Sequence, residues 1–316
     1  MKTYRLQFIL ESRLTQIPDS QTIFGAFCFG LKAVFGSSYL ESLLSNLHQK
    51  NASLVISSMF LHDTLPMPMN IEPKKIEMEN LNSIDFQKIK KLKKVQYMSL
   101  NLFKEYLQNS EPFLSSFYQR LINESYVIHD KHRVIIDKHQ LDYFDSIEKK
   151  NDVATRNHVS MIEEEKSLFY TPHLIYTHQT VFDVYIKTTD DLWNDIKHML
   201  STYHRLTIGP KGSIGYNQFS YQQYEIMDFA HQNSWKVLLS KAKFINTQLD
   251  IEHSYYQTGL IEPKYTNDIS GKRYKNPFIA LYEGSVVTTD LEVIGEWMID
   301  QPHDRIIYHH ALGLLV

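Results

Sequence analysis

Glycine is scarce along this chain except at one place, and that cluster limits the fold more than any other feature. The chain has 316 residues and 11 glycines, and Gly209, Gly212 and Gly215 fall within one stretch of seven residues. Glycine permits positive φ and lets the backbone approach a ligand closely, and successive turned amides can form an anion-binding concavity. The cluster therefore predicts either a loop that binds an anion or an ordinary connecting turn.

The sequence around these glycines is basic and aromatic, although the whole chain has a formal net charge of −3. Residues 196–224 contain no Asp or Glu, but they contain Lys197, Arg205 and Lys211, and Ser213 adds a hydroxyl group. The aromatic residues of this stretch, on which bases could stack, are Tyr203, Tyr216, Phe219 and Tyr221. Because the whole chain is not basic, a nucleic-acid site must be a local patch, and this stretch is the candidate.

Periodicity places the glycine loop, residues 209–215, after a helix and before a strand. Segments with strand-like alternation or helix-like spacing of apolar residues follow the order strand, helix, strand, strand, helix, strand, which is a β-α-β-β-α-β unit. They are residues 4–8, 23–34, 53–60, 180–187, 190–200 and 216–226. A Walker loop needs four residues between its glycines and then Lys-Ser/Thr, which this loop lacks, and a dinucleotide loop follows a strand and opens a helix. A small-nucleotide site is therefore disfavoured here.

The ends and faces of these elements can also be predicted. In the first strand, Tyr4, Leu6 and Phe8 alternate with Arg5 and Gln7, which indicates a half-buried strand with the two polar residues on the other face. Asp19 or Ser20 can cap the first helix, and Asp190 or Asp191 can cap the second.

The chain between the second and third of these strands is a long insertion. Its predicted elements are an irregular segment at 61–82, a helix from Lys88 to Leu107, an extended pair at 125–137, and a hairpin or flap formed by 153–159 and 167–176. Five lysines between residues 88 and 94 indicate a solvated helix face, with a contact to RNA or a partner as the alternative.

A polar, non-periodic stretch at 228–234 marks a domain boundary, and the chain beyond it is mostly extended. The sequence therefore predicts an α+β fold of two ferredoxin-like (RRM-like) modules with a glycine-rich loop, the second module being degenerate. Residues 1–228 form the first domain, with the inserted helical and flap segments. Residues 229–316 form a smaller β-rich domain.

Several classes of protein are excluded or disfavoured. The single cysteine, Cys28, rules out a disulfide framework and any multi-cysteine metal site, and its apolar surroundings indicate a buried thiol. The first residues lack the apolar core of a signal peptide, and no apolar run is long enough to span a membrane. We therefore expect a soluble, cytoplasmic protein without a cofactor.

The chain resembles the RAMP superfamily of CRISPR RNA-binding proteins, and within it subunit four of the type III-A Csm effector complexes. A glycine loop between the second helix and the last strand of a ferredoxin-like fold is the mark of that superfamily. Further supporting residues are Thr22–Ala26, Ile56–Phe60, Leu65–Pro68, Arg156-Asn157 before Leu168–Tyr170, and Gln301–His303 with Gly313-Leu314. The resemblance covers nearly the whole chain, and the order of these motifs carries it.

The resemblance implies a non-catalytic RNA-binding subunit that holds the 5′ repeat-derived handle of crRNA in antiviral defence. It implies two protein partners, the large polymerase-nuclease subunit and the backbone RAMP subunit, and no membrane. The residues expected to bind RNA are Gly209, Lys211, Gly212, Ser213, Gly215, Tyr216, Arg156, Asn157, Arg205, Ser20 and Thr22. For Arg156, a surface ion pair with one of the glutamates at 163–165 is the alternative.

An enzyme is the alternative interpretation. Related RAMP proteins cleave CRISPR repeat RNA without a metal, with His, Tyr or Lys as acid and base, so a metal-independent endoribonuclease is the second hypothesis. The dipeptides His62-Asp63, His129-Asp130 and His303-Asp304 raise a metal-phosphohydrolase reading, but three scattered dipeptides lack the spacing of a ligand set. We therefore predict no catalytic residue and no metal site.

Residues 276–304 carry six acids and no Lys or Arg, with Trp297 and Met298 among them. Phosphate would be repelled there, so RNA is not expected on this segment. It predicts either a solvated helix with a buried Trp297 or a docking face for a partner protein, steered by its acids.

Overall fold

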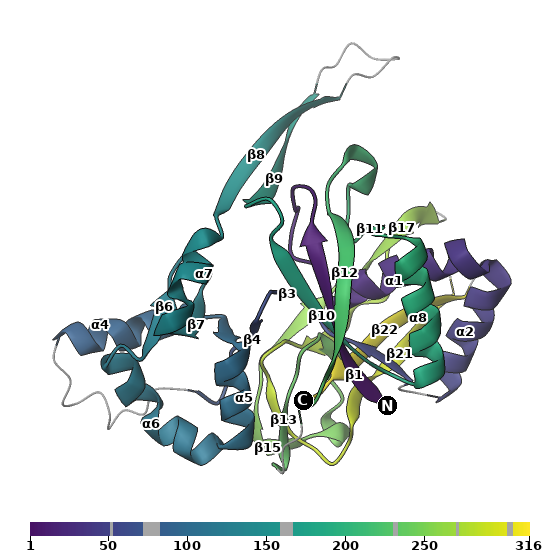
Figure 1. Ribbon diagram of the computed structural model, residues 1–316. Helices are drawn as coiled ribbons and strands as arrows, with labels where there is room; N and C mark the ends of the chain where they lie inside the picture. Colours follow the sequence, from purple (N-terminus) through teal and green to yellow (C-terminus); the bar gives the residue numbers. More distant parts are fainter. Residues whose placement is uncertain (51–52, 72–82, 159–166, 230–232, 270–271, 302–305) are drawn as a thin grey trace.

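The computed structural model describes residues 1–50, 53–71, 83–158, 167–229, 233–269, 272–301 and 306–316 (Figure 1). At its centre is an antiparallel sheet in the order β11-β12-β1-β10-β2, with β3 also paired to β10. Its strands are β1 (Lys2–Leu10), β2 (Leu54–Ile56), β3 (Phe60–Leu61), β10 (Val181–Thr188), β11 (Arg205–Thr207) and β12 (Gln218–Met227). The helices packed beside it are α1 (Ser20–Phe35), α2 (Ser37–Lys50) and α8 (Asp190–Thr202). The predicted β-α-β-β-α-β succession is therefore present.

The first strand is buried on both faces, which corrects the half-buried strand expected from its alternation. Tyr4, Leu6 and Phe8 are buried as predicted, but Arg5 and Gln7 are only 5% and 9% exposed. The reason is topological. β1 is an inner strand, between β12 and β10, and the side chains on its polar face have partners: Arg5 binds Asp63, in the turn between β3 and β4 (Thr64–Pro66), and Gln7 binds Gln223 of β12.

The start of α1 follows the prediction, and the start of α8 does not. The Asp19 carboxylate accepts hydrogen bonds from the backbone N–H of Thr22 at 3.0 Å and from its hydroxyl at 2.7 Å, as an N-cap does. In α8 the N-cap is Thr189, which makes no side-chain cap bond, and Asp190 and Asp191 lie in the first turn. There their charges favour the positive end of the helix dipole.

The insertion forms a small sheet covered by helices, in the strand order β4-β5-β7-β6. Its elements are α4 (Ser83–Leu92), β5 (Tyr97–Ser99), α5 (Leu100–Gln108), α6 (Ser110–Ile122), β6 (Tyr126–His129), β7 (Val134–Asp137), the 3₁₀ turn η1 (Lys138–Gln140) and α7 (Leu141–Ser146). The predicted helix from Lys88 to Leu107 is wrong because β5 interrupts it. Met98 of β5 is fully buried between β4 and β7, which supply its backbone partners.

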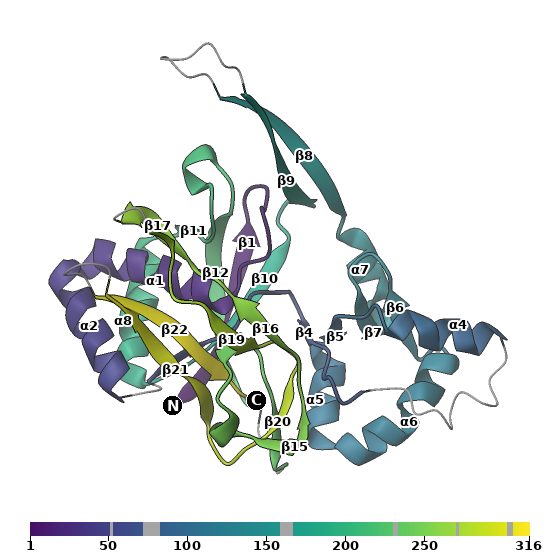
Figure 2. The ribbon, with the colours of Figure 1, turned by 180° about the vertical axis from the view of Figure 1, so that it is seen from behind.

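A long hairpin completes the insertion and projects beyond the central sheet (Figures 1 and 2). It consists of β8 (Lys149–His158) and β9 (Ser167–Tyr176), paired from Lys149↔Tyr176 to His158↔Ser167. This confirms the predicted flap. The predicted strand at 53–60 is divided into β2 and β3, with Ser57–Met59 between them.

The described part of 229–316 consists of strands and one short 3₁₀ turn, η3 (Asn246–Gln248). The strands are β13 (Trp235–Val237), β14 (Ala242–Lys243), β15 (Asp250–Tyr255), β16 (Thr258–Ile261), β17 (Lys264–Ile269), β18 (Lys272–Tyr274), β19 (Phe278–Leu281), β20 (Val286–Thr288), β21 (Val293–Asp300) and β22 (Ile307–Leu314). The solvated helix, one of the two alternatives for 276–304, is therefore wrong for the described part of that segment. The division at residue 228 and the count of two ferredoxin-like modules stay predictions.

The C-terminal strands pack against the first helix. Phe24 of α1 meets Trp297 edge to face at 5.2 Å between ring centroids and stacks on His310 at 5.1 Å. Nε2 of His310 donates to the carbonyl of Leu54 at 3.2 Å. Trp297 is thus a core residue, and the hypothesis that it forms part of a docking face is not supported. Among the described residues, no helix is long and apolar enough to cross a membrane.

Candidate nucleic-acid interface

The glycine loop is the tip of a β-hairpin. It joins β11 to β12, which pair from Arg205↔Ser220 to Thr207↔Gln218. The prediction that the loop follows directly on a helix is wrong because β11 has only three residues, too few for a periodic signal. Lys211 and Gly215 have φ of +63° and +86°, so the chain turns through the left-handed region on both sides of η2 (Gly212–Ile214).

The three glycines serve different purposes. At Gly209 an added Cβ would lie 2.9 Å from Nδ2 of Asn217, and at Gly212 it would lie 2.1 Å from Cγ2 of Thr207. These two glycines make room for the side chains of the residues that flank the loop. At Gly215 nothing lies within 4 Å of an added Cβ. Gly215 alone of the three leaves open space above its backbone, where a ligand could approach.

Asn217 fixes the loop to the turn after β1. Its side chain is fully buried, and its Oδ1 accepts from the backbone N–H of Thr15 at 2.9 Å. Its Nδ2 donates to the carbonyl of Pro210, and its backbone N–H donates to the carbonyl of Arg13 at 2.9 Å. The loop is therefore held at both ends by buried hydrogen bonds.

The loop also contacts the projecting hairpin. The Lys211 ammonium donates to the Thr171 hydroxyl of β9 at 2.9 Å, and the ring of Tyr216 packs on His173 at 5.7 Å. Tyr216 is only 4% exposed. Its ring therefore positions the loop against β9 and is not open to a stacking base in this structure.

The exposed part of the interface consists of Lys211, Ser213 and Gly215 on the loop and Arg205 on β11. The fold adds Arg13, an exposed cation that sequence reasoning missed because only the hydrogen bond to Asn217 brings it beside the loop. The fold also adds an acid to the acid-free stretch. The Glu11 carboxylate accepts from the Ser220 hydroxyl at 2.6 Å.

The other four residues expected to bind RNA are not in contact with the loop by any described interaction. The backbones of Arg156 and Asn157 lie in β8, and their side chains, like residues 163–165, lie outside the described part of the structure. Ser20 is fully buried at the start of α1, where its backbone N–H donates to the Ser58 hydroxyl at 3.2 Å. Thr22 binds the N-cap of the same helix.

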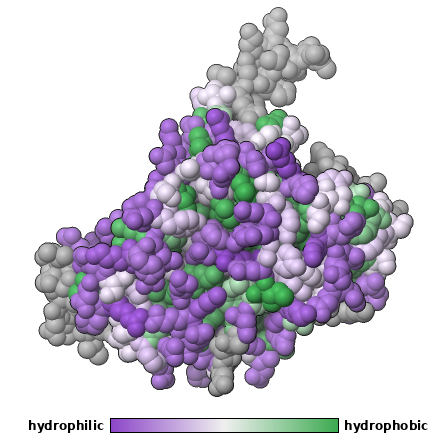
Figure 3. All heavy atoms as spheres, in the orientation of Figure 1, coloured by the Kyte–Doolittle hydropathy of each residue, from purple (hydrophilic) through white to green (hydrophobic). Residues whose placement is uncertain are grey.

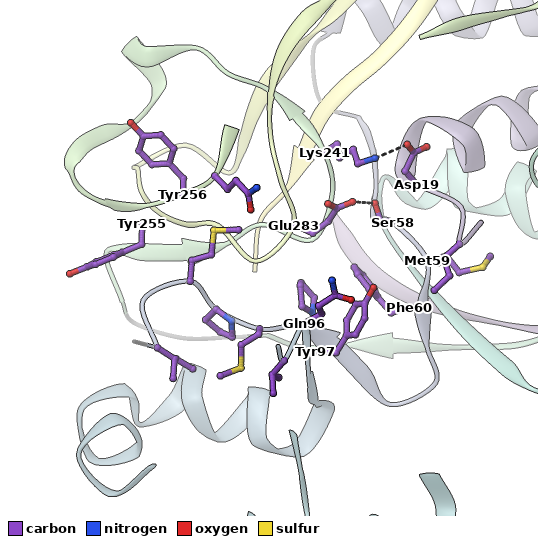
Figure 4. Close-up of a pocket in the computed structure, with 18 of the residues that line it drawn as sticks. Asp19, Ser58, Met59, Phe60, Gln96, Tyr97, Lys241, Tyr255, Tyr256 and Glu283 are labelled. Atoms are coloured by element: carbon purple, nitrogen blue, oxygen red, sulfur yellow. Dashed lines mark hydrogen bonds and ion pairs between the residues drawn. The ribbon is translucent and has the colours of Figure 1, made fainter. Parts of the chain in front are cut away.

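Ser20 lies beside a cavity with a volume of about 1340 Å³ (Figure 4). Asp19 pairs with Lys241 at 3.0 Å, and Ser58 donates to the Glu283 carboxylate. Burial raises the pKa of Glu283. The cavity lies where the central sheet, the insertion and the C-terminal strands meet, so its lining residues are far apart in sequence and no local pattern announces it.

One predicted His-Asp dipeptide does meet another acid. His62, Asp63 and the fully buried Asp183 bring their ligand atoms within 4.8 Å of one another. Arg5 lies among them, with Nη2 at 2.5 Å from Asp63, 2.7 Å from Asp183 and 2.9 Å from Nδ1 of His62, while Nη1 donates to Glu225 at 2.7 Å. The guanidinium occupies the position where a metal would neutralise the two acids.

The electrostatics of this cluster follow from the same contacts. Burial disfavours charge on His62, but the hydrogen bond to Asp183 and the negative charges of Asp183 and Asp63 together outweigh burial, so the pKa of His62 is raised. In the second dipeptide, His129-Asp130, the two side chains bind different partners. His129 binds Asp145 at 3.0 Å, and Asp130 binds Lys91 at 2.8 Å. The third, His303-Asp304, lies outside the described residues.

Comparison with known proteins gives a likeness over the full chain. A Csm3–Csm4 subcomplex of the type III-A CRISPR-Cas interference complex matches with a TM-score of 0.62 and 15% identity, covering 100% of this chain and 98% of that chain. Csm1–Csm4 cassettes bound to cA4 and to pppApA match with TM-scores of 0.60 and 0.59 and identities of 17% and 16%, each covering 100% of this chain and 97% of that chain. No family model and no curated protein matches the chain.

These likenesses confirm the predicted resemblance at the level of the fold. The identities are low, so the path of the backbone, rather than particular side chains, carries the match. Over its whole length the chain has the fold of the Csm4 subunit of type III-A CRISPR-Cas structures.

Proposed function

We propose that this chain is a non-catalytic RNA-binding subunit of a type III-A Csm interference complex. It holds the 5′ repeat-derived handle of crRNA and bridges the large polymerase-nuclease subunit and the backbone subunit. The full-length likeness to Csm4 subunits supports the place in a complex, because structures with that fold contain Csm3 or Csm1 as a partner. Such a subunit acts in antiviral defence.

The open backbone at Gly215 is the observation that carries the RNA-binding part. The exposed groups around it are the Lys211 ammonium, the Ser213 hydroxyl and the Arg205 and Arg13 guanidiniums. Cations and backbone N–H groups are the donors that RNA phosphates accept from. Binding through phosphates predicts an affinity that falls steeply as salt rises.

The alternative function, a metal-independent endoribonuclease, finds less support in the geometry. A His, a Tyr and a Lys do gather where the loop meets β9, namely His173, Tyr216 and Lys211. However, His173 and Tyr216 are 3% and 4% exposed. Neither ring can reach a ribose hydroxyl without a rearrangement of the loop. Incubation with labelled repeat RNA should therefore give no defined cut.

Two substitutions at Gly215 test the proposed binding mode. Ala strains the left-handed backbone more than Asn does, but Asn fills more of the open space. If RNA approaches this backbone, handle RNA should bind Gly215→Asn more weakly than Gly215→Ala, while Gly215→Asn should be the more stable protein. Fluorescence anisotropy with handle-length RNA measures the order of the affinities, and urea unfolding measures the order of the stabilities.

Comparing the order of the affinities with the order of the stabilities separates an effect on binding from an effect on folding. If affinity follows stability, so that Gly215→Ala binds more weakly than Gly215→Asn, the effect is one of loop folding. If neither variant changes the affinity at moderate salt, the glycine loop is only a turn and the proposed binding mode is wrong.

A further inference from the structure

A second basic cluster lies on the insertion, and the proposed function does not use it. Lys91 and Lys94, at and just beyond the end of α4, and Arg133, on the turn between β6 and β7, line one hollow of about 410 Å³ together with Ile128 and Asp130. We call Lys91, Lys94 and Arg133 the α4 cluster. The lysine run singled out in the sequence therefore does more than cover a helix face, because the fold adds an arginine from a different element.

The acid in the hollow neutralises one of the three cations. Lys91 pairs with Asp130 at 2.8 Å. Lys94 and Arg133 are exposed, and neither forms an ion pair with a residue that the structure describes. A lysine at the end of a helix is favoured by the negative end of the helix dipole, which accounts for Lys91. The dipole does not account for Arg133, which comes from another element.

The backbone holds Arg133 in place. Its φ is +53°, a left-handed conformation that a residue other than glycine keeps only where its surroundings impose it. Its carbonyl accepts the backbone N–H groups of Gln96 at 2.8 Å and Tyr97 at 3.1 Å. These two bonds fasten the β6–β7 turn to the chain that follows α4, so Lys94 and Arg133 are kept beside one another.

Positive charge continues from the cluster to the foot of the projecting hairpin. Burial, and after it the charge of Arg133, lowers the pKa of Lys149, the first residue of β8. Lys150, the next residue, is exposed. In both ribbon views α7 lies at the foot of the β8–β9 hairpin, and β6 and β7 lie next to α7 (Figures 1 and 2). Like charges held together repel one another, and a bound anion would relieve that repulsion.

We propose that Lys94 and Arg133 form a second phosphate-binding site, which contacts the backbone of the RNA beyond the portion held at the glycine loop. The inference rests on the proposed function, because it assigns this surface to the same RNA. A strand that leaves the loop along the hairpin reaches the cluster through Lys149 and Lys150.

The composition of the hollow favours RNA over a partner protein. Protein interfaces are depleted in Lys and enriched in aromatic residues at their centre, whereas Ile128 is the one apolar residue in the described lining. The face of the molecule around α4, β6 and β7 is mainly hydrophilic (Figure 3). Lys and Arg beside a polar surface are what phosphate contacts use.

The test compares two RNAs, one of handle length and one extended at its 3′ end by about two handle lengths. Lys94→Gln with Arg133→Gln should leave binding of the short RNA unchanged and weaken the long RNA about tenfold at low salt. The slope of log K against log salt for the long RNA should fall by about 1.4, since each lost phosphate contact with a single strand is worth about 0.7. Fluorescence anisotropy of the full chain across a salt series measures both quantities.

The matched control is Lys2→Gln with Lys32→Gln, which removes the same charge from exposed lysines of β1 and α1. It should bind both RNAs like the unmodified protein. If the Lys94/Arg133 variant binds the long RNA with the original affinity and slope, the α4 cluster is only a solvated surface and the inference is overturned. An equal loss on both RNAs, or a loss also in the control, overturns it as well.

The same experiment distinguishes failure of the proposed function from failure of this inference. If the unmodified chain does not bind the short RNA, but the long RNA depends on Lys94 and Arg133, the handle-binding proposal fails and the phosphate site stands. If the variant binds both RNAs normally but no longer co-purifies with a partner subunit, the cluster docks an acidic protein surface, and the inference is wrong.

Discussion

Arg5 lies in the middle of the central sheet, where a charge is costly unless it is paired. It is 5% exposed and contacts Asp183, Asp63, Glu225 and His62. Burial opposes its charge, but the hydrogen bonds and charges of the acids dominate, so the pKa of Arg5 is raised. These contacts join β1, β10 and β12 to the turn that begins the insertion.

Replacing Arg5 tests whether the cluster is structural. Arg5→Met should lower the free energy of unfolding by about 3–5 kcal/mol, because the fully buried Asp183 carboxylate loses its cation. Arg5→Met combined with Asp183→Asn should recover more than half of that loss, since no buried charge is then left alone. Urea unfolding measures both. A double variant less stable than Arg5→Met would contradict this account.

At the scale of elements, one side-chain contact joins the glycine loop to the projecting hairpin. Lys211 donates to Thr171 of β9, and Thr171 is 1% exposed. The contact uses the ammonium that we assign to RNA phosphate, so the two uses compete. Replacing Thr171 and Lys211 in separate variants distinguishes the two uses of the ammonium.

Thr171→Val keeps the shape of residue 171 and removes its hydroxyl. It should destabilise the protein by about 1 kcal/mol, the usual worth of one hydrogen bond, and leave handle RNA binding unchanged or slightly stronger. Lys211→Ala should weaken binding several-fold because a phosphate contact is lost. Anisotropy and urea unfolding of the two variants measure this. Equal weakening by both would mean that Lys211 acts by holding the hairpin.

The insertion shows the limit of periodicity at this scale. The spacing of apolar residues from Lys88 to Leu107 fits one helix, yet β5 (Tyr97–Ser99) divides it into α4 and α5. Three residues are too few to alternate visibly. What makes them a strand is the pairing offered by β4 and β7, which comes from elsewhere in the chain.

For the whole molecule, the apolar core is continuous across the predicted domain boundary. One buried cluster includes Leu6 of the central sheet, Phe103 of the insertion and Val286 of the C-terminal strands. Units that share a core are expected to unfold together, because none of them can separate without exposing apolar surface of the others.

The fluorescence of the three tryptophans can show whether these units unfold together. Trp193 stacks on Tyr4 in the central sheet, Trp235 lies 4.9 Å from Tyr106 of the insertion, and Trp297 packs on Phe24. Three variants that each keep one tryptophan, with Phe at the other two positions, should show coincident urea midpoints by fluorescence. A lower midpoint for the Trp235 reporter alone would make the insertion a separate unit of unfolding.

Much of the fold was predictable because its signals are local. The alternation in β1 and β10, the cap at Asp19 and the two halves of the β8–β9 hairpin each depend on neighbouring residues, and the order of elements follows from them. The glycine cluster marked the loop for the same reason, since positive φ is a property of single residues. The predicted resemblance rested on the order of sequence motifs along the chain, and the likeness to Csm3–Csm4 and Csm1–Csm4 structures confirms it at the level of the fold.

Tertiary structure decided what lies next to each element. Arg5 was expected to face solvent because alternation gives the two faces of a strand but not what covers them. The different surroundings of Gly209, Gly212 and Gly215 depend on how the hairpin folds back on its own residues Thr207 and Asn217. The cavity beside Ser20 depends on side chains that the fold brings from distant segments. The sequence alone determined which residues turn, cap and alternate. Only the packing determined which charges are buried and which remain open to a phosphate, because both depend on contacts between segments far apart in the chain.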